Sequence, residues 1–181
     1  MSTHDRLLAL LRERSVRRQK VILASGRESD FYVDARQTTL HPEGAASIAE
    51  LVLDLLEDDI VGVGGPVTGA DPIAGAVAAL SHLRGRPVSG FMVRKEPKGH
   101  GLKLWVEGRA NLPDGGRVAM VEDTVTTGGS LLRAIERVEA NGLVVAQVIV
   151  VVDREEGARE RLAEAGYELV ALTGRRELLG E

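Results

Sequence analysis

The chain of 181 residues is long enough for one domain with an aliphatic core, because 44 % of its residues are apolar and only 3 % are aromatic. It contains no cysteine, which excludes disulfides, thiolate metal sites and a cysteine nucleophile. No apolar run approaches the ~20 residues of a membrane helix and the net charge is −4, so we expect a cytoplasmic protein, a single domain over residues 1–181, with no membrane or nucleic-acid partner.

The first sixty residues predict a helix, a hairpin and a second helix. Leucines recur at helical spacing near the N-terminus, and two short apolar segments flank a Ser-Gly-Arg turn. A proline then stands where the first position of the next helix is expected. The predicted elements are a helix over residues 3–18, strands over 20–24 and 31–34, and a helix over 42–57.

The rest of the chain alternates apolar strands with helices, which is typical of an α/β fold with a mostly parallel sheet. Residues 144–152 form the most apolar segment and are suited to the middle of such a sheet. The predicted strands are 60–63, 88–93, 117–121, 144–152 and 167–172. The predicted helices are 71–84, 130–141 and a charged one between 155 and 165, and the predicted loops include 94–101 and 122–129.

The clearest functional motif follows the strand over 117–121. Glu122 and Asp123 come at the carboxyl end of this strand, where open α/β sheets bind ligands. Hydroxyl residues, glycines and a helix start come next, and free amides at a helix start attract phosphate. The acids suit sugar hydroxyls on the same ligand, so the motif predicts a site for a phosphorylated ribose. The alternative is an ordinary glycine turn whose acids face water.

A second motif is basic. Of the four lysines in the chain, Lys95, Lys98 and Lys103 lie within nine residues, in a segment that also contains Arg94 and His100. Flexible lysine charges are suited to following a departing pyrophosphate. The alternative is a solvated basic loop.

These motifs resemble the orotate phosphoribosyltransferase family. The resemblance also covers the turn Ser25-Gly26-Arg27 with its hairpin, the segment from Gly64 to Pro72, and Asp153-Arg154. It implies the type I phosphoribosyltransferase fold, with a central mostly parallel sheet flanked by helices, a small N-terminal hairpin or hood, and a mobile catalytic loop. The chain departs from many relatives at Ala24 and at Val67-Thr68-Gly69, where the relatives have lysine-containing sequences.

The resemblance also implies an activity, which is transfer of the 5-phosphoribosyl group from phosphoribosyl pyrophosphate to orotate. Lys98 and Asp123 are the expected catalytic residues, and Thr126 and Arg154 are expected to bind orotate. A homodimer with shared active sites is implied, with Mg²⁺ held mainly by substrate and not directly by protein. The residues expected to bind phosphoribosyl pyrophosphate are Arg94, Lys95, Lys98, His100, Glu122, Asp123, Thr124, Val125, Thr126, Thr127, Gly128, Gly129 and Ser130.

Two other functions remain open at this point. A phosphoribosyltransferase for another base, such as adenine, would share residues 122–130 but should lack the Lys-Lys-His segment. A regulatory protein of the same fold would sense the sugar pyrophosphate and bind nucleic acid through the basic run of Arg12, Arg14, Arg17, Arg18 and Lys20, although Glu13 interrupts that run. Arg154 also has a structural alternative, an ion pair with Glu155 or Glu156.

Overall fold

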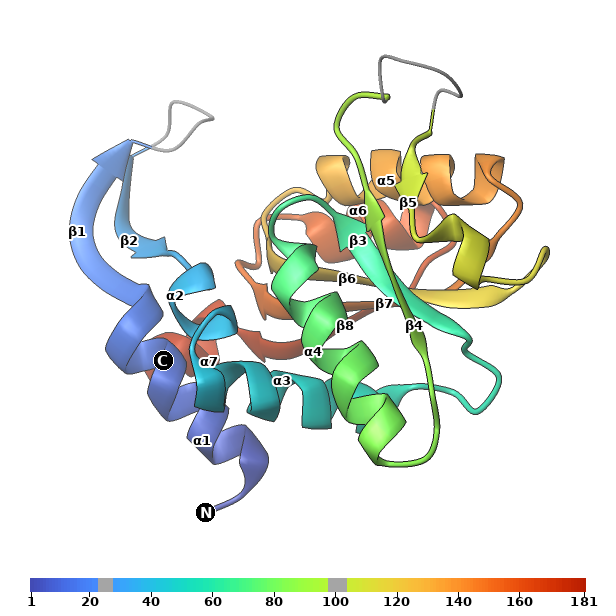
Figure 1. Ribbon diagram of the computed structural model, residues 1–181. Coiled ribbons are helices and arrows are strands. Elements are labelled where there is room, and N and C mark those ends of the chain that lie inside the picture. The colour runs from blue at the N-terminus through green and yellow to red at the C-terminus, as the bar shows by residue number, and fades with distance from the viewer. Residues whose placement is uncertain (23–27, 98–103) are drawn as a thin grey trace.

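The computed structural model describes residues 1–22, 28–97 and 104–181, and for residues 18–22 and 28–30 it describes the backbone only. A six-stranded sheet in the order β5-β4-β3-β6-β7-β8 forms the centre, and β1 and β2 form a separate hairpin (Figure 1). All neighbours in the large sheet are parallel except β5, which runs antiparallel to β4. The sheet strands are β3 (Gly62–Pro66), β4 (Ser89–Val93), β5 (Val106–Glu107), β6 (Arg117–Val125), β7 (Val144–Asp153) and β8 (Leu169–Gly174).

Helices cover both faces of this sheet, as the α/β prediction requires (Figure 1). Alternate residues of β6 and β7 enter two different hydrophobic clusters, since successive strand residues point to opposite faces. One cluster contains Ala119 and Ile149 with α3, α4 and the N-terminal elements, and the other contains Met120 and Val148 with α5 and α6. These helices are α3 (Pro42–Leu55), α4 (Ala70–Leu83), α5 (Gly129–Ala140), α6 (Ala158–Glu164) and α7 (Arg175–Leu179).

An N-terminal hood, defined as residues 3–22 and 28–39, lies beside the sheet at the left of Figure 1. It packs into the same cluster as the sheet through Leu7, Leu11 and Phe31. Within the hood, a buried hydrogen bond of 2.7 Å joins the hydroxyls of Ser15 and Thr38. The hood consists of α1 (Thr3–Leu10), a π-helical turn (Leu11–Ser15), β1 (Val16–Ile22), β2 (Glu28–Val33) and α2 (Arg36–Thr39).

The predicted helix over residues 3–18 is therefore wrong beyond Ser15. Val16 pairs with Val33 and Arg17 with Tyr32 in the antiparallel hairpin, and these ladder bonds outweigh the helix propensity of the arginines. The basic run consequently does not share one helical face. The guanidinium of Arg12 is also occupied, because it donates to the carbonyls of Leu178 (3.1 Å) and Glu177 (2.6 Å) in α7.

The predicted end of the strand at Val121 is also wrong. β6 continues to Val125, and Glu122, Thr124 and Val125 pair in parallel register with Val150, Val152 and Asp153 of β7. Acidic residues are poor strand formers, but β6 lies between β3 and β7, and hydrogen bonding to β7 keeps the acids in the strand. The acid pair therefore belongs to the sheet and not to a loop.

The segment between β4 and β5 has a fixed base. The amide of Arg94 donates to the carbonyl of Trp105 at 2.9 Å, and Arg137 of α5 donates to the carbonyl of Arg94 at 2.8 Å. The guanidinium carbon of Arg137 lies 4.2 Å from the centre of the Trp105 ring. Trp105 thus anchors the segment on α5. Within the described residues, no helix is long and apolar enough to cross a membrane.

Candidate functional site

A cleft of about 350 Å³ opens where the carboxyl ends of β3, β4 and β6 meet the hood. This is the edge at which open parallel sheets bind ligands. Five residues of the predicted site line it, which are Lys95, Glu122, Asp123, Thr124 and Ser130. The hood contributes residues 32–36, and the connection between β3 and α4 contributes residues 66–69.

The acid pair lies against the β3–α4 connection. A Cβ atom on Gly69 would lie 2.4 Å from Oε1 of Glu122 and 2.5 Å from Oδ1 of Asp123, so a larger residue there would displace the two carboxyl groups. Burial, and after it the charge of Asp123, raises the pKa of Glu122 to about 9. Burial also raises the pKa of Asp123. Two crowded acids of this kind suit a ligand that brings hydroxyl donors or positive charge.

The raised pKa of Glu122 predicts a pH-dependent stability. Above pH 4.5 the unfolded chain releases this proton while the folded chain retains it up to about pH 9, so stability falls as pH rises between these values. We expect Glu122→Gln to lose less unfolding free energy between pH 6 and pH 9 than the unaltered chain. The difference should be roughly 1 kcal/mol or more, since one pKa unit corresponds to about 1.4 kcal/mol. Urea unfolding at both pH values measures it.

A matched control removes a carboxylate that is not buried. The Asp58 side chain is fully exposed, so Asp58→Asn also removes one negative charge but should leave the pH dependence unchanged. If the free energy of unfolding changed equally with pH in Glu122→Gln and in the unaltered chain, Glu122 would not be the source of the pH dependence.

The connection from β6 to α5 leads into the amino end of a helix, which is a suitable binding site for an anion. Gly128 adopts a φ of +75°, which favours glycine, and α5 begins at Gly129, one residue before the predicted start. The first amides of an α-helix have no partner within the helix, and the helix dipole is positive there. The hydroxyl of Thr124 is buried and has no hydrogen-bond partner among the described residues. Val125 is buried at 3 % exposure, so its side chain is not available to a ligand.

The predicted basic residues divide into two groups. Lys95 lines the cleft, whereas the Nε atom of Arg94 forms an ion pair with Oε1 of Glu107 at 3.3 Å, at the edge of the sheet. Lys98 and His100 lie outside the described residues. Arg36 of the hood lines the cleft as well, although no motif of the sequence pointed to it as a site residue.

Arg154 follows β7 and does not line this cleft. Its amide donates to the carbonyl of Val125 at 3.0 Å, which ties the ends of β7 and β6 together. Its side chain is 8 % exposed and pairs with Glu156 at 2.9 Å, as the structural alternative predicts, while its Nε is buried without a hydrogen-bond partner among the described residues. The guanidinium carbon lies 5.9 Å from the centre of the Phe31 ring. Thr126 and Thr127 are exposed and also lie outside the lining.

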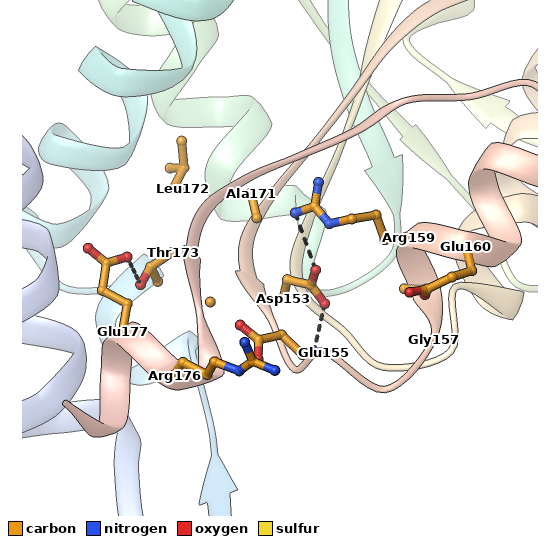
Figure 2. A pocket seen from close by; sticks show the side chains of 12 residues that line it. Asp153, Glu155, Gly157, Arg159, Glu160, Ala171, Leu172, Thr173, Arg176 and Glu177 are labelled. Atoms are coloured by element: carbon orange, nitrogen blue, oxygen red, sulfur yellow. Dashed lines mark hydrogen bonds and ion pairs between the residues drawn. The ribbon is translucent and has the colours of Figure 1, made fainter. Parts of the chain in front are cut away.

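A second cavity of about 530 Å³ lies at the ends of β7 and β8 (Figure 2). Most of the charged side chains that line it form ion pairs or hydrogen bonds. Arg159 lies 3.5 Å from Asp153 and Arg176 lies 3.4 Å from Glu155, while the Thr173 hydroxyl donates to Glu177 at 2.8 Å. None of the predicted site residues lines this cavity, so the cleft beside the acid pair is the candidate site.

Comparison with known proteins agrees with this location. The phosphoribosyl transferase domain family matches residues 36–166, which include the cleft residues of both β6 and α5. An orotate phosphoribosyltransferase of Rhodopseudomonas palustris (strain BisB5) is 48 % identical over 181 residues, which cover 98 % of this chain and 97 % of the relative.

Solved structures show the same relationship. The crystal structure of Mycobacterium tuberculosis H37Rv orotate phosphoribosyltransferase in complex with Fe(III) dicitrate has a TM-score of 0.85 and 42 % identity, over 98 % of this chain and 99 % of that one. The same enzyme in complex with 5-phospho-α-D-ribosyl 1-diphosphate has a TM-score of 0.81 and 40 % identity over the same shares. At these identities and over this length the relationship is one of family, and the chain belongs to the orotate phosphoribosyltransferases.

Proposed function

We propose that this protein is a cytoplasmic homodimer that transfers the 5-phosphoribosyl group from phosphoribosyl pyrophosphate to orotate, giving orotidine 5′-phosphate and pyrophosphate for pyrimidine synthesis. The proposal rests on how the end of β6 and the start of α5 are arranged around the cleft. This arrangement places a crowded acid pair directly before the amino end of a helix, in one cleft that also contains Lys95. Family relatives named for this reaction support the choice of orotate over another base.

The residues act on different parts of the sugar substrate. Glu122 and Asp123 accept hydrogen bonds from the ribose hydroxyls, and the start of α5 with Ser130 binds the 5′-phosphate. Each hydrogen bond to a charged oxygen contributes about 1.5–3 kcal/mol, so a few of them hold the sugar firmly. A bond forms between the orotate ring nitrogen and the anomeric carbon, and the bond from that carbon to the pyrophosphate oxygen breaks. The proton of the ring nitrogen passes to pyrophosphate or water. The protein positions the two reactants and stabilises the departing charge, so it needs no nucleophile of its own.

Magnesium fits this cleft as an ion held mainly by substrate oxygens. The acid pair would repel a diphosphate placed beside it, and a divalent cation between them removes that repulsion. When bound, the ion supplies positive charge that neutralises the departing pyrophosphate. Glu122 and Asp123 would help to hold the ion, through the ribose hydroxyls or water.

A direct assay tests the proposed function. Orotate, phosphoribosyl pyrophosphate and magnesium are mixed with the protein, and the ultraviolet absorbance of orotate is followed. We expect it to fall only when all three are present. Adenine or hypoxanthine in place of orotate should give no pyrophosphate. Pyrophosphate release with a purine and none with orotate would reassign the enzyme to another base.

The arrangement of the basic residues supports the proposed dimer. Lys95 faces the cleft of its own chain, whereas Arg94 is directed to Glu107 at the sheet edge. Two neighbouring cations, Arg94 and Lys95, therefore do not face the same cleft. A cation of this segment that does not face its own cleft could bind substrate in the cleft of a second chain. Lys98 is proposed to complete the site of the partner.

Subunit exchange tests this sharing of sites. Lys98→Ala and Asp123→Asn proteins, each inactive alone, are mixed under conditions in which subunits exchange. Because each Lys98 would complete the site of its partner, both defects then fall in one site of the mixed dimer. The other site is intact, so up to about half of the sites work and activity should return. Tagged subunits measure the exchange itself. Full exchange without recovered activity would mean that each site is built from one chain.

A further inference from the structure

Arg36 is a cation of the hood that faces the cleft. It is the first residue of α2, and it lines the cleft together with the acid pair and Lys95. Burial raises the pKa of Asp123, and the positive charge of Arg36 acts in the opposite direction, so the two groups are close in space. Neither the predicted ribose site nor the predicted phosphate site includes this arginine.

The side chain of Arg36 is held by one end only. Its Nε donates to Oδ1 of Asp34 at 2.9 Å, and Gln37 donates to the other oxygen of Asp34 at 3.2 Å. The amide of Asp34 donates to the carbonyl of Ser15 at 3.0 Å, next to the buried Ser15–Thr38 contact. No partner for the two terminal nitrogens of Arg36 is found in the described part of the chain, and the side chain is half exposed. The guanidinium is therefore oriented but still available to a ligand.

The sheet order and the lining of the cleft together indicate which part of the substrate faces Arg36, because Arg36 lines the cleft with residues 67–69 and Lys95, whereas Arg154 does not line it. The acid pair on β6 marks the ribose, and Arg154 follows β7 on one side of β6. The connection at residues 67–69 follows β3, on the other side of β6, and Lys95 follows β4 beyond it. The attacking base and the departing group lie on opposite faces of the anomeric carbon in a direct displacement. If orotate takes the side of β7, the diphosphate must lie on the side of β3 and β4.

We propose that Arg36 binds the diphosphate of phosphoribosyl pyrophosphate through its two terminal nitrogens, from the hood side of the cleft. The planar guanidinium matches two phosphate oxygens, which a lysine cannot do in the same geometry. Asp34 serves as the positioning residue that aims it. This assignment rests on the proposed function, because it takes that substrate as given.

Steady-state kinetics of Arg36→Gln in both directions tests the assignment. We expect the KM for phosphoribosyl pyrophosphate, and the KM for pyrophosphate in the reverse reaction, to rise about ten- to a hundred-fold. The KM for orotate should change less than about threefold, since the base lies on the other side of the sugar. Arg36→Lys should recover part of the loss, because it restores the charge without the planar pair of donors.

A matched control is Arg84→Gln on α4, remote from the cleft. The Arg84 side chain is 40 % exposed and likewise pairs with an aspartate, Asp54, at 3.0 Å. Its kinetics should equal those of the unaltered enzyme. Thermal unfolding of both variants separates a folding defect from a binding defect. A higher KM for orotate alone, or unchanged constants for both phosphate ligands, would overturn the assignment.

Direct binding distinguishes this proposal from the proposed function. Calorimetric titration of the unaltered chain and Arg36→Gln with phosphoribosyl pyrophosphate and magnesium requires no turnover. Weaker binding by the variant supports the arginine assignment even if orotate proves to be the wrong base. Equal binding in an enzyme that does use orotate refutes the assignment and leaves the function intact.

Discussion

Replacing Lys98 by alanine is expected to lower the turnover number by about 10²–10³-fold, the loss that follows removal of one preorganised charge donor in other enzymes. Negative charge builds up on the pyrophosphate as its bond to the sugar breaks, so a cation at this point stabilises the transition state more than bound substrate. The turnover number should therefore fall more than the affinity. The prediction comes from the sequence, because Lys98 lies outside the described residues.

Rapid-quench measurement of a single turnover shows whether the chemical step itself is slowed. Lys103→Ala is the matched control, since this lysine belongs to the same basic segment and has no assigned role. Its rate should stay within about threefold of the unaltered enzyme, well below the loss expected for Lys98. If Lys98→Ala turned over at the normal rate, this lysine would have no part in the mechanism.

Replacing Arg154 by alanine is expected to reduce kcat/KM for orotate by about 10²–10⁴-fold, because two charge-assisted hydrogen bonds to an anionic base contribute about 1.5–3 kcal/mol each. In the structure the guanidinium pairs with Glu156 at 2.9 Å, so orotate must compete with this carboxylate or join it. Arg154→Lys should lose much of the same activity, since the planar pair of donors is absent. The KM for phosphoribosyl pyrophosphate should change little.

The control for Arg154 is Arg159→Ala. Arg159 likewise pairs with an acidic residue, Asp153 at the end of β7, but it lines the second cavity (Figure 2), and its side chain is 55 % exposed. Because Arg154→Ala removes a largely buried ion pair, urea unfolding must accompany the kinetics. Equal losses toward orotate and phosphoribosyl pyrophosphate would indicate a general distortion of the site and not an orotate contact.

The long elements of the fold were predictable from sequence because their hydrophobic pattern matches their surroundings. β7 is apolar except for Gln147 and the terminal Asp153, and it lies between β6 and β8, while α3 begins at Pro42 as predicted. The predictions are wrong where hydrogen bonding between segments distant in the sequence determines the secondary structure. The arginines at the start of β1 favour a helix locally, and only β2 makes them a strand. The two-residue β5 and the five-residue α7 are too short to give a periodic pattern.

The site was predictable to the same extent. The acid pair and the glycine-containing helix start are continuous in sequence, so their spacing revealed them. Arg36 is different, because its position at the cleft depends on the folding of the hood. The Ser15–Thr38 hydrogen bond, between residues 23 apart in the sequence, fixes that fold beside Arg36. A faint signal was available, since Asp34 and Arg36 are spaced for a local ion pair beside the hairpin. The position of Gly69 against the acids depends on three-dimensional packing and had no signal of its own.

The position of Trp105, whose ring packs against Arg137 at the end of the segment between β4 and β5, is useful for binding experiments. The chain contains a single tryptophan, so its fluorescence emission comes from this one place. Arg94 connects to it through a backbone hydrogen bond, and the cleft residue Lys95 follows directly. A ligand that draws Lys95 inward alters the electric field around the indole, so binding can be titrated optically, without a dye and without turnover.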